Sequence, residues 1–134
     1  MRDTNKFSIL LLVMVLGDPG CVGHNTCDYK FISQTKSQDR KYVATVYHRT
    51  CNTGWHDTSV VLTEPRFLDP SSSSPYMETH VVVLTGSHPL NVAWKDATHL
   101  VITIPSLAED DVEDVKRSLN GAYKTWRNVS IEYR

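Results

Sequence analysis

The 134-residue chain lacks an apolar run long enough to cross a membrane as a helix. Its main apolar segment, 7–17, covers about ten apolar residues, whereas a spanning helix needs roughly 20. Arg2 and Lys6 precede this segment, and Gly-Asp-Pro-Gly at 17–20 breaks any helix after it. This order is typical of a signal peptide, so we predict that residues 1–20 are removed on export.

Several motifs and charge patterns are also missing. The chain carries a formal net charge of −1 and shows no basic patch, so we predict no nucleic-acid partner. It contains no P-loop, no dinucleotide fingerprint and no Gly-x-Ser-x-Gly elbow, and we predict no cofactor. These absences favour a protein that catalyses no reaction, and an enzyme stays the alternative.

Cysteine is scarce, and the first of the three, Cys21, lies four residues beyond the apolar segment. Gly20-Cys21 is similar to the end of a bacterial lipoprotein signal, although Asp18 and Pro19 depart from that motif. We therefore expect Cys21 to carry lipid and to anchor the protein to a membrane of the cell envelope, in the periplasm or on the outer surface. Two alternatives are cleavage near Gly20 or Gly23, which would release a secreted protein, and a protein that is not exported.

The other two cysteines, Cys27 and Cys51, fall in the region that should fold. In an oxidising compartment they can pair and close a loop of about 25 residues, worth on the order of 3 kcal/mol. The alternative is two unpaired thiols.

Removal of the signal leaves 114 residues, enough for one domain. We assign 21–27 to an anchor linker and 28–134 to a single β-rich domain.

Most of this domain is predicted to be β-strand. Short segments rich in β-branched and aromatic residues predict strands at 41–48, 58–63, 79–85, 90–95, 99–105 and 128–133. The fourth and fifth of these resemble a hairpin, and the Pro- and Ser-rich stretch 64–78 predicts a long loop. We expect an α+β domain, mostly antiparallel, with five to seven strands and one C-terminal helix.

The helix is predicted after residue 105. Ser106 and Glu109 have the spacing of a capping box, and Gly121 is a typical terminator. An apolar stripe repeats at three and four residues, at Val112, Val115 and Leu119. The acidic residues between 109 and 114 suit the positive N-terminal end of the helix, which explains them without a bound cation.

The stretch 27–62 resembles a family of small, uncharacterised bacterial lipoproteins. In that family a cysteine precedes a Ser-Pro-Asp-Gly-Lys turn, and Tyr-x-Ala-x-Val, Arg-Asp-Cys-Gly and a Ser-Thr pair follow. The counterparts here are Cys27, 37–41, 42–46, 49–52 and Thr58-Ser59. Gln38 and Arg40 replace the Pro and Gly of the turn, and 52–57 differs from the family's Gly-rich segment. The resemblance implies a cell-envelope location and no particular reaction.

Two sets of side chains are candidates for a site. His48, His56 and Asp57 surround Cys51, and two imidazoles with a carboxylate can bind zinc. A metal-binding protein or metal-dependent hydrolase is therefore one hypothesis. The competing interpretation places His48 at a strand end and His56 and Asp57 in a turn. Trp55 and Tyr76, both in predicted loops, form a candidate recognition surface. The leading hypothesis is a non-catalytic accessory or protein-interaction domain that binds another envelope protein.

Overall fold

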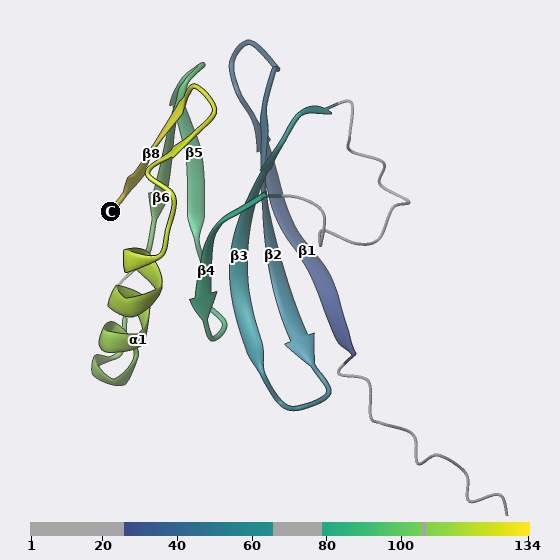
Figure 1. Cartoon of the computed structure of the whole chain (residues 1–134), viewed down its shortest axis with the longest axis vertical. Coiled ribbons are helices and arrows are strands. Elements are labelled where there is room, and N and C mark those ends of the chain that lie inside the picture. Colours follow the sequence, from purple (N-terminus) through teal and green to yellow (C-terminus); the bar gives the residue numbers. More distant parts are fainter. Residues whose placement is uncertain (1–25, 66–78, 106) are drawn as a thin grey trace, which may run out of the picture.

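The structure is a computed structural model that describes residues 26–65, 79–105 and 107–134. These residues form eight strands and one helix (Figure 1), in the order β1 (Cys27–Lys36), β2 (Val43–Cys51), β3 (His56–Thr63), β4 (Thr79–Thr85), β5 (Asn91–Asp96), β6 (His99–Thr103), α1 (Glu109–Asn120), β7 (Thr125–Trp126) and β8 (Val129–Tyr133). The predicted signal peptide, Cys21 and most of the predicted loop 64–78, including Tyr76, lie outside the described residues.

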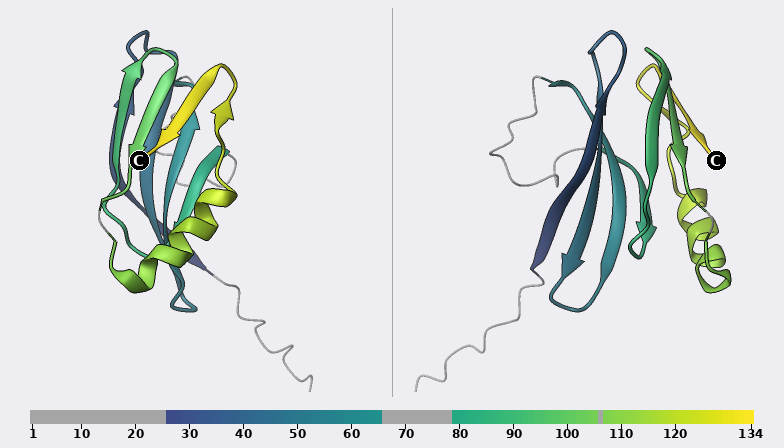
Figure 2. Two further views of the ribbon diagram at one scale, coloured as in Figure 1. Left: turned by 90° about the vertical axis from the view of Figure 1, so that its left-hand side faces the viewer. Right: turned by 180° about the vertical axis from the view of Figure 1, so that it is seen from behind.

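The strands form two four-stranded sheets that pack face to face. Strands β1 to β4 follow one another as an antiparallel meander, which we call sheet A, and the second sheet has the order β5-β6-β8-β7. The two sheets are seen edge-on in the right-hand view of Figure 2. Apolar side chains from both sheets and from α1 meet in one core, including Val60, Leu62, Leu100, Ile102 and Val115. Burial of this continuous apolar surface is the main force that holds the two sheets together.

The β-rich class with one helix is confirmed, but the strand count is higher than the predicted five to seven. The prediction missed β1 and the two-residue β7. Strand β1 is an edge strand in which seven of the ten residues are exposed, so its sequence lacks the apolar density of the other strands. The β5–β6 hairpin is confirmed, whereas β6 pairs with β8 in parallel, after a crossover that contains α1.

Helix α1 forms on the predicted apolar stripe but begins later than the capping box implies. Its N-cap residue is Ala108, with no side-chain hydrogen bond to the first turn, and Ser106 is outside the described residues. Val115 is buried, and Gly121 is the C-cap, as expected. In the described residues no helix has the length and apolar character needed to cross a membrane.

The two faces of sheet A differ in their surroundings. Ala44, Val46, Val60 and Leu62 point inward to the core. On the outer face, residues near the β1–β2 turn, such as Val43 and Val61, are also fully buried. The accessible part of the outer face is therefore the half that lies toward the Cys27–Cys51 end of the sheet.

Candidate functional site

Strand register brings polar and aromatic side chains together on the outer face of sheet A. Tyr29 lies opposite Arg49, and Arg49 lies opposite Asp57. In the next outward row, Phe31, Tyr47, Ser59 and Val83 follow one another across β1 to β4. Because side chains two residues apart on a strand share a face, the two rows form one continuous surface.

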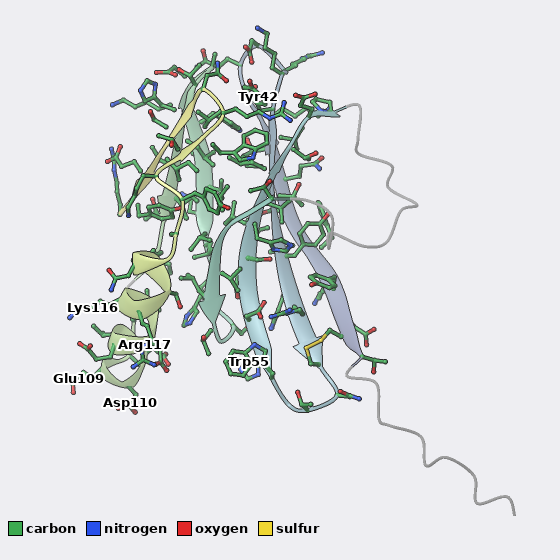
Figure 3. The ribbon with its side chains drawn as sticks, in the orientation of Figure 1. Tyr42, Trp55, Glu109, Asp110, Lys116 and Arg117 are labelled. Carbon is green, nitrogen blue, oxygen red and sulfur yellow. A yellow bond between two sulfur atoms is a disulfide. The ribbon has the colours of Figure 1, made fainter. Side chains whose placement is uncertain are left out.

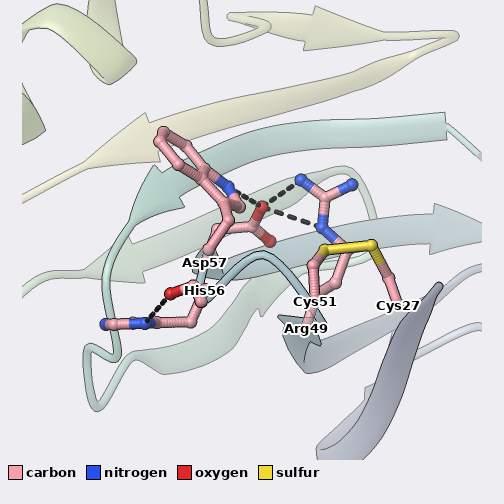
Figure 4. Close-up of a disulfide and its surroundings, with 7 residues drawn as sticks. Cys27, Arg49, Cys51, His56 and Asp57 are labelled. Atoms are coloured by element: carbon pink, nitrogen blue, oxygen red, sulfur yellow. Dashed lines mark hydrogen bonds and ion pairs between the residues drawn. A yellow bond between two sulfur atoms is a disulfide. The ribbon is translucent and has the colours of Figure 1, made fainter. Parts of the chain in front are cut away.

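A buried ion pair lies within the first row. The Arg49 guanidinium donates two hydrogen bonds to Asp57 Oδ2, the one from Nε over 2.9 Å. Asp57 is only 2% exposed, and its Oδ2 also accepts the Trp55 indole N–H over 3.1 Å. Figure 4 shows the Asp57 carboxylate meeting the Arg49 side chain close to the disulfide. The hydrogen bonds to Asp57 raise the pKa of Arg49, so its guanidinium stays charged. Asp57 also holds Trp55 against the sheet through the indole hydrogen bond.

Aromatic side chains cover this accessible half-face. The Tyr47 ring makes edge contacts with two other rings. Its centre lies 6.3 Å from that of Tyr29 and 6.4 Å from that of Phe31. Phe31, Trp55 and Val83 are 56%, 51% and 39% exposed, and Trp55 projects at the same end of the molecule as the disulfide (Figure 3). We call Tyr29, Phe31, Tyr47, Trp55 and Val83 the aromatic face.

A shallow cavity of about 290 Å³ opens in the aromatic face. Its walls come from Tyr29, Val83 and His80, and the Arg49–Asp57 pair contributes polar groups. The nearby Ser59 hydroxyl is buried and has no hydrogen-bond partner in the described residues. An apolar wall beside a few fixed polar groups is suited to accept one side chain of a partner or a small ligand.

The expected Cys27–Cys51 disulfide is present in the structure. The two cysteines are register partners in β1 and β2, so the bond joins the start of β1 to the end of β2. Asn52 N–H also donates to the Thr26 carbonyl over 2.9 Å, just outside the bridge. These links fix the strand end that carries Tyr29, Arg49 and Trp55.

The three candidate metal ligands from the sequence do not come together. His48 and His56 lie on the inward side of sheet A, with ring centres 6.2 Å apart. Asp57 points to the outer face, because it follows His56 directly in a strand, and its carboxylate is bound by Arg49. In residues 26–65, 79–105 and 107–134, no group of three or more His, Cys, Asp or Glu side chains is placed to hold a metal ion.

Among the two residues of the predicted recognition surface, only Trp55 is described, and it is half exposed. Sequence reasoning missed Phe31, Arg49 and Ser59. Phe31 went unnoticed because β1 was not predicted as a strand, and Arg49 gains its role only from the register that sets it opposite Asp57.

Comparison of this chain with known protein families, with curated proteins and with solved structures finds no match.

Proposed function

We propose that this is an exported, lipid-anchored protein of the bacterial cell envelope that binds another envelope protein through the aromatic face and catalyses no reaction. The signal-like N-terminus, with Cys21 behind it, supports export and the anchor. A disulfide in a small β-rich domain is compatible with an oxidising compartment. The resemblance of residues 27–62 to bacterial lipoproteins implies the same location, which stays a prediction.

The observation that carries the proposal is the exposure of Phe31, Trp55 and Val83 on one rigid half-face. Single exposed apolar residues are ordinary, but a contiguous aromatic group beside an arginine has the composition of a protein interface core. Trp, Tyr and Arg contribute most to binding when a partner excludes water from them. The cavity beside Arg49 and Val83 offers a place for one anchoring side chain of the partner.

The aromatic face is also organised before binding. Trp55 is held by Asp57, Tyr47 by its two ring contacts, and the strand ends by the disulfide. A surface fixed in this way loses little side-chain entropy when it meets a partner, which favours recognition.

Site-specific photocrosslinking tests the proposal in the cells that produce the protein. A photoreactive phenylalanine analogue at position 31 is expected to give one discrete crosslinked product, and the same analogue at Glu132, which is exposed on the second sheet, is expected to give none. Trp55→Ala in the position-31 protein should abolish the product without unfolding the domain. Equal crosslinking from both positions, or from neither, would contradict a protein partner at the aromatic face.

The anchor has a separate test. Intact mass of the mature protein extracted from membranes should show a chain that begins at Cys21 and carries acyl groups, with Cys27 and Cys51 oxidised. A chain that retains Met1 with three free thiols would contradict export altogether, whatever the crosslinking shows.

A further inference from the structure

We propose that His48 and His56 form a binding site for one divalent transition-metal ion of the kind that prefers imidazole, with Zn²⁺ and Cu²⁺ as the expected occupants. The site lies on the inward side of sheet A at its disulfide end, away from the aromatic face, and it does not depend on the proposed function. It differs from the ligand set suggested by the sequence, because Asp57 is on the other face and is bound by Arg49.

The distance between the two rings suits a shared ion. Two imidazoles that bind one ion, each with a metal–nitrogen bond of about 2.0–2.1 Å, place their ring centres roughly 5 to 6 Å apart. The ring centres of His48 and His56 are 6.2 Å apart, on adjacent antiparallel strands. His56 is exposed, so a rotation of its side chain closes the remaining gap at small cost.

The hydrogen bonds of each ring leave the same nitrogen for a metal. His48 Nδ1 lies 3.3 Å from Ser87 Oγ, and His56 Nδ1 lies 3.3 Å from the Gly54 carbonyl oxygen. Histidine ligands commonly use one ring nitrogen for the metal while the other is held by an oxygen in this way. Nε2 of both residues is therefore the expected ligand atom.

His48 Nε2 provides an independent indication. This atom is buried and has no hydrogen-bond partner in the described part of the chain. A buried polar atom without a partner costs roughly 1–3 kcal/mol, and such atoms are rare in folded proteins. A bound ion would supply the missing partner.

The surroundings hold His48 in place. The buried Thr58 hydroxyl donates to the Gly86 carbonyl over 2.9 Å and accepts the His88 backbone N–H over 3.0 Å. These bonds fix the segment that places Ser87 against His48. A ring oriented by packing and hydrogen bonds binds metal more tightly than a mobile surface histidine.

Ligand chemistry selects the class of ion. Imidazole nitrogen suits Zn²⁺, Cu²⁺ and Ni²⁺, whereas Ca²⁺ and Mg²⁺ require several oxygen ligands. Two protein ligands leave further coordination positions for water or for a group of a partner molecule.

Calorimetric titration of the untagged mature protein, freed of metal by chelation, tests the site. We expect one Zn²⁺ or Cu²⁺ per chain and no saturable binding of Ca²⁺. His48→Gln and His56→Gln should each weaken binding by at least about tenfold, because either change removes one of two protein ligands. His99→Gln, an exposed histidine paired with Asp96, should leave affinity unchanged.

Two further measurements separate ligand loss from misfolding. Asp57→Asn should retain the metal if the histidine pair alone binds it, and loss of metal in this variant with native circular dichroism would overturn the assignment. In the wild-type protein, Zn²⁺ should shift the NMR signals of the His48 and His56 rings before those of any other histidine. Absence of a saturable site, or equal weakening by His99→Gln, would likewise overturn it.

Discussion

Trp94 in β5 donates its indole N–H to the main-chain carbonyl of Thr35 in β1 over 3.2 Å, and this bond joins the edge strands of the two sheets. The Trp94 ring also packs against the core. The bond therefore gives the partly buried indole N–H a hydrogen-bond partner in the other sheet.

We expect Trp94→Phe to lower the free energy of unfolding by about 1–2 kcal/mol, since one hydrogen bond is lost and the smaller phenyl ring fills less of the space that the indole occupies against the core. Urea unfolding followed by circular dichroism measures this change. Amide exchange should speed up in both β1 and β5, because the bond couples them. Faster exchange in β5 alone would mean that the bond does not hold the sheets together.

Removal of Arg49 and removal of Asp57 should lower the free energy of unfolding by different amounts. Arg49→Met leaves the buried Asp57 carboxylate without its counterion and should destabilise by about 2–4 kcal/mol. Asp57→Asn should cost less, about 1–2 kcal/mol, because Arg49 is 29% exposed and can turn to water.

The double variant Arg49→Met, Asp57→Asn should recover much of the loss seen in Arg49→Met, because no buried charge remains. Lys30→Met, an exposed cation on β1, serves as a control and should change stability by less than about 0.5 kcal/mol. Equal losses in the two single variants would contradict this account of the pair.

The disulfide closes a loop with a sequence separation of 24 residues. For this length, Cys27→Ala combined with Cys51→Ala should lower the free energy of unfolding by about 3 kcal/mol, mainly by freeing the unfolded chain. Urea unfolding of the double variant and of the reduced wild-type protein should give similar midpoints. A double variant as stable as the oxidised protein would show that the bond adds nothing to stability.

Local patterns in the sequence predicted much of the fold. The apolar strands β2 to β6 and the stripe of α1 have strong periodic signals, and the pairing of Cys27 with Cys51 followed from their number and position. Strand β1 could not be predicted in the same way, because an edge strand with mostly exposed residues needs few apolar side chains. The parallel pairing of β6 with β8 is a long-range contact, which no local pattern encodes.

The site was harder to predict than the fold, for a related reason. His56 and Asp57 were assigned to a turn, where neighbouring side chains can converge on one ion. The structure places them at the start of β3, so they point to opposite faces of sheet A. Arg49 had no visible role in the sequence, because only the β2–β3 register sets it opposite Asp57.

The turn between β1 and β2 contains a residue in an unfavourable conformation. Arg40 has a φ of 58°, in the left-handed region that glycine adopts readily. Arg40→Gly should raise the free energy of unfolding by about 0.5–1 kcal/mol, since relief of strain exceeds the entropy that glycine adds to the unfolded chain. Urea unfolding measures the gain.

Arg127 provides a matched comparison for this prediction. It has a similar φ of 53°, but its guanidinium pairs with Glu64 and lies 4.9 Å from the centre of the Trp126 ring. Arg127→Gly should therefore give a smaller gain than Arg40→Gly, or a loss. A larger gain at Arg127 would show that these contacts are unimportant.

Because Tyr133 is partly buried, the free energy of unfolding should fall at high pH. Burial raises the pKa of Tyr133 to about 12, and its hydroxyl donates to the Tyr123 carbonyl over 2.7 Å. The unfolded chain loses this proton near pH 10, whereas the folded protein keeps it until about pH 12. The stabilisation from neutral Tyr133 is therefore complete below pH 10 and is lost as the pH rises from 10 to 12.

Urea unfolding at several pH values from 8 to 11 should show this loss as a fall in the free energy of unfolding. The other groups that ionise in this range are present in both wild type and Tyr133→Phe, so the comparison isolates the tyrosine. By pH 11 the wild-type protein should lose about 1 kcal/mol more than the variant, a figure reduced for the partial exposure of the ring. Parallel curves for the two proteins would mean that Tyr133 ionises equally easily in the folded and unfolded states.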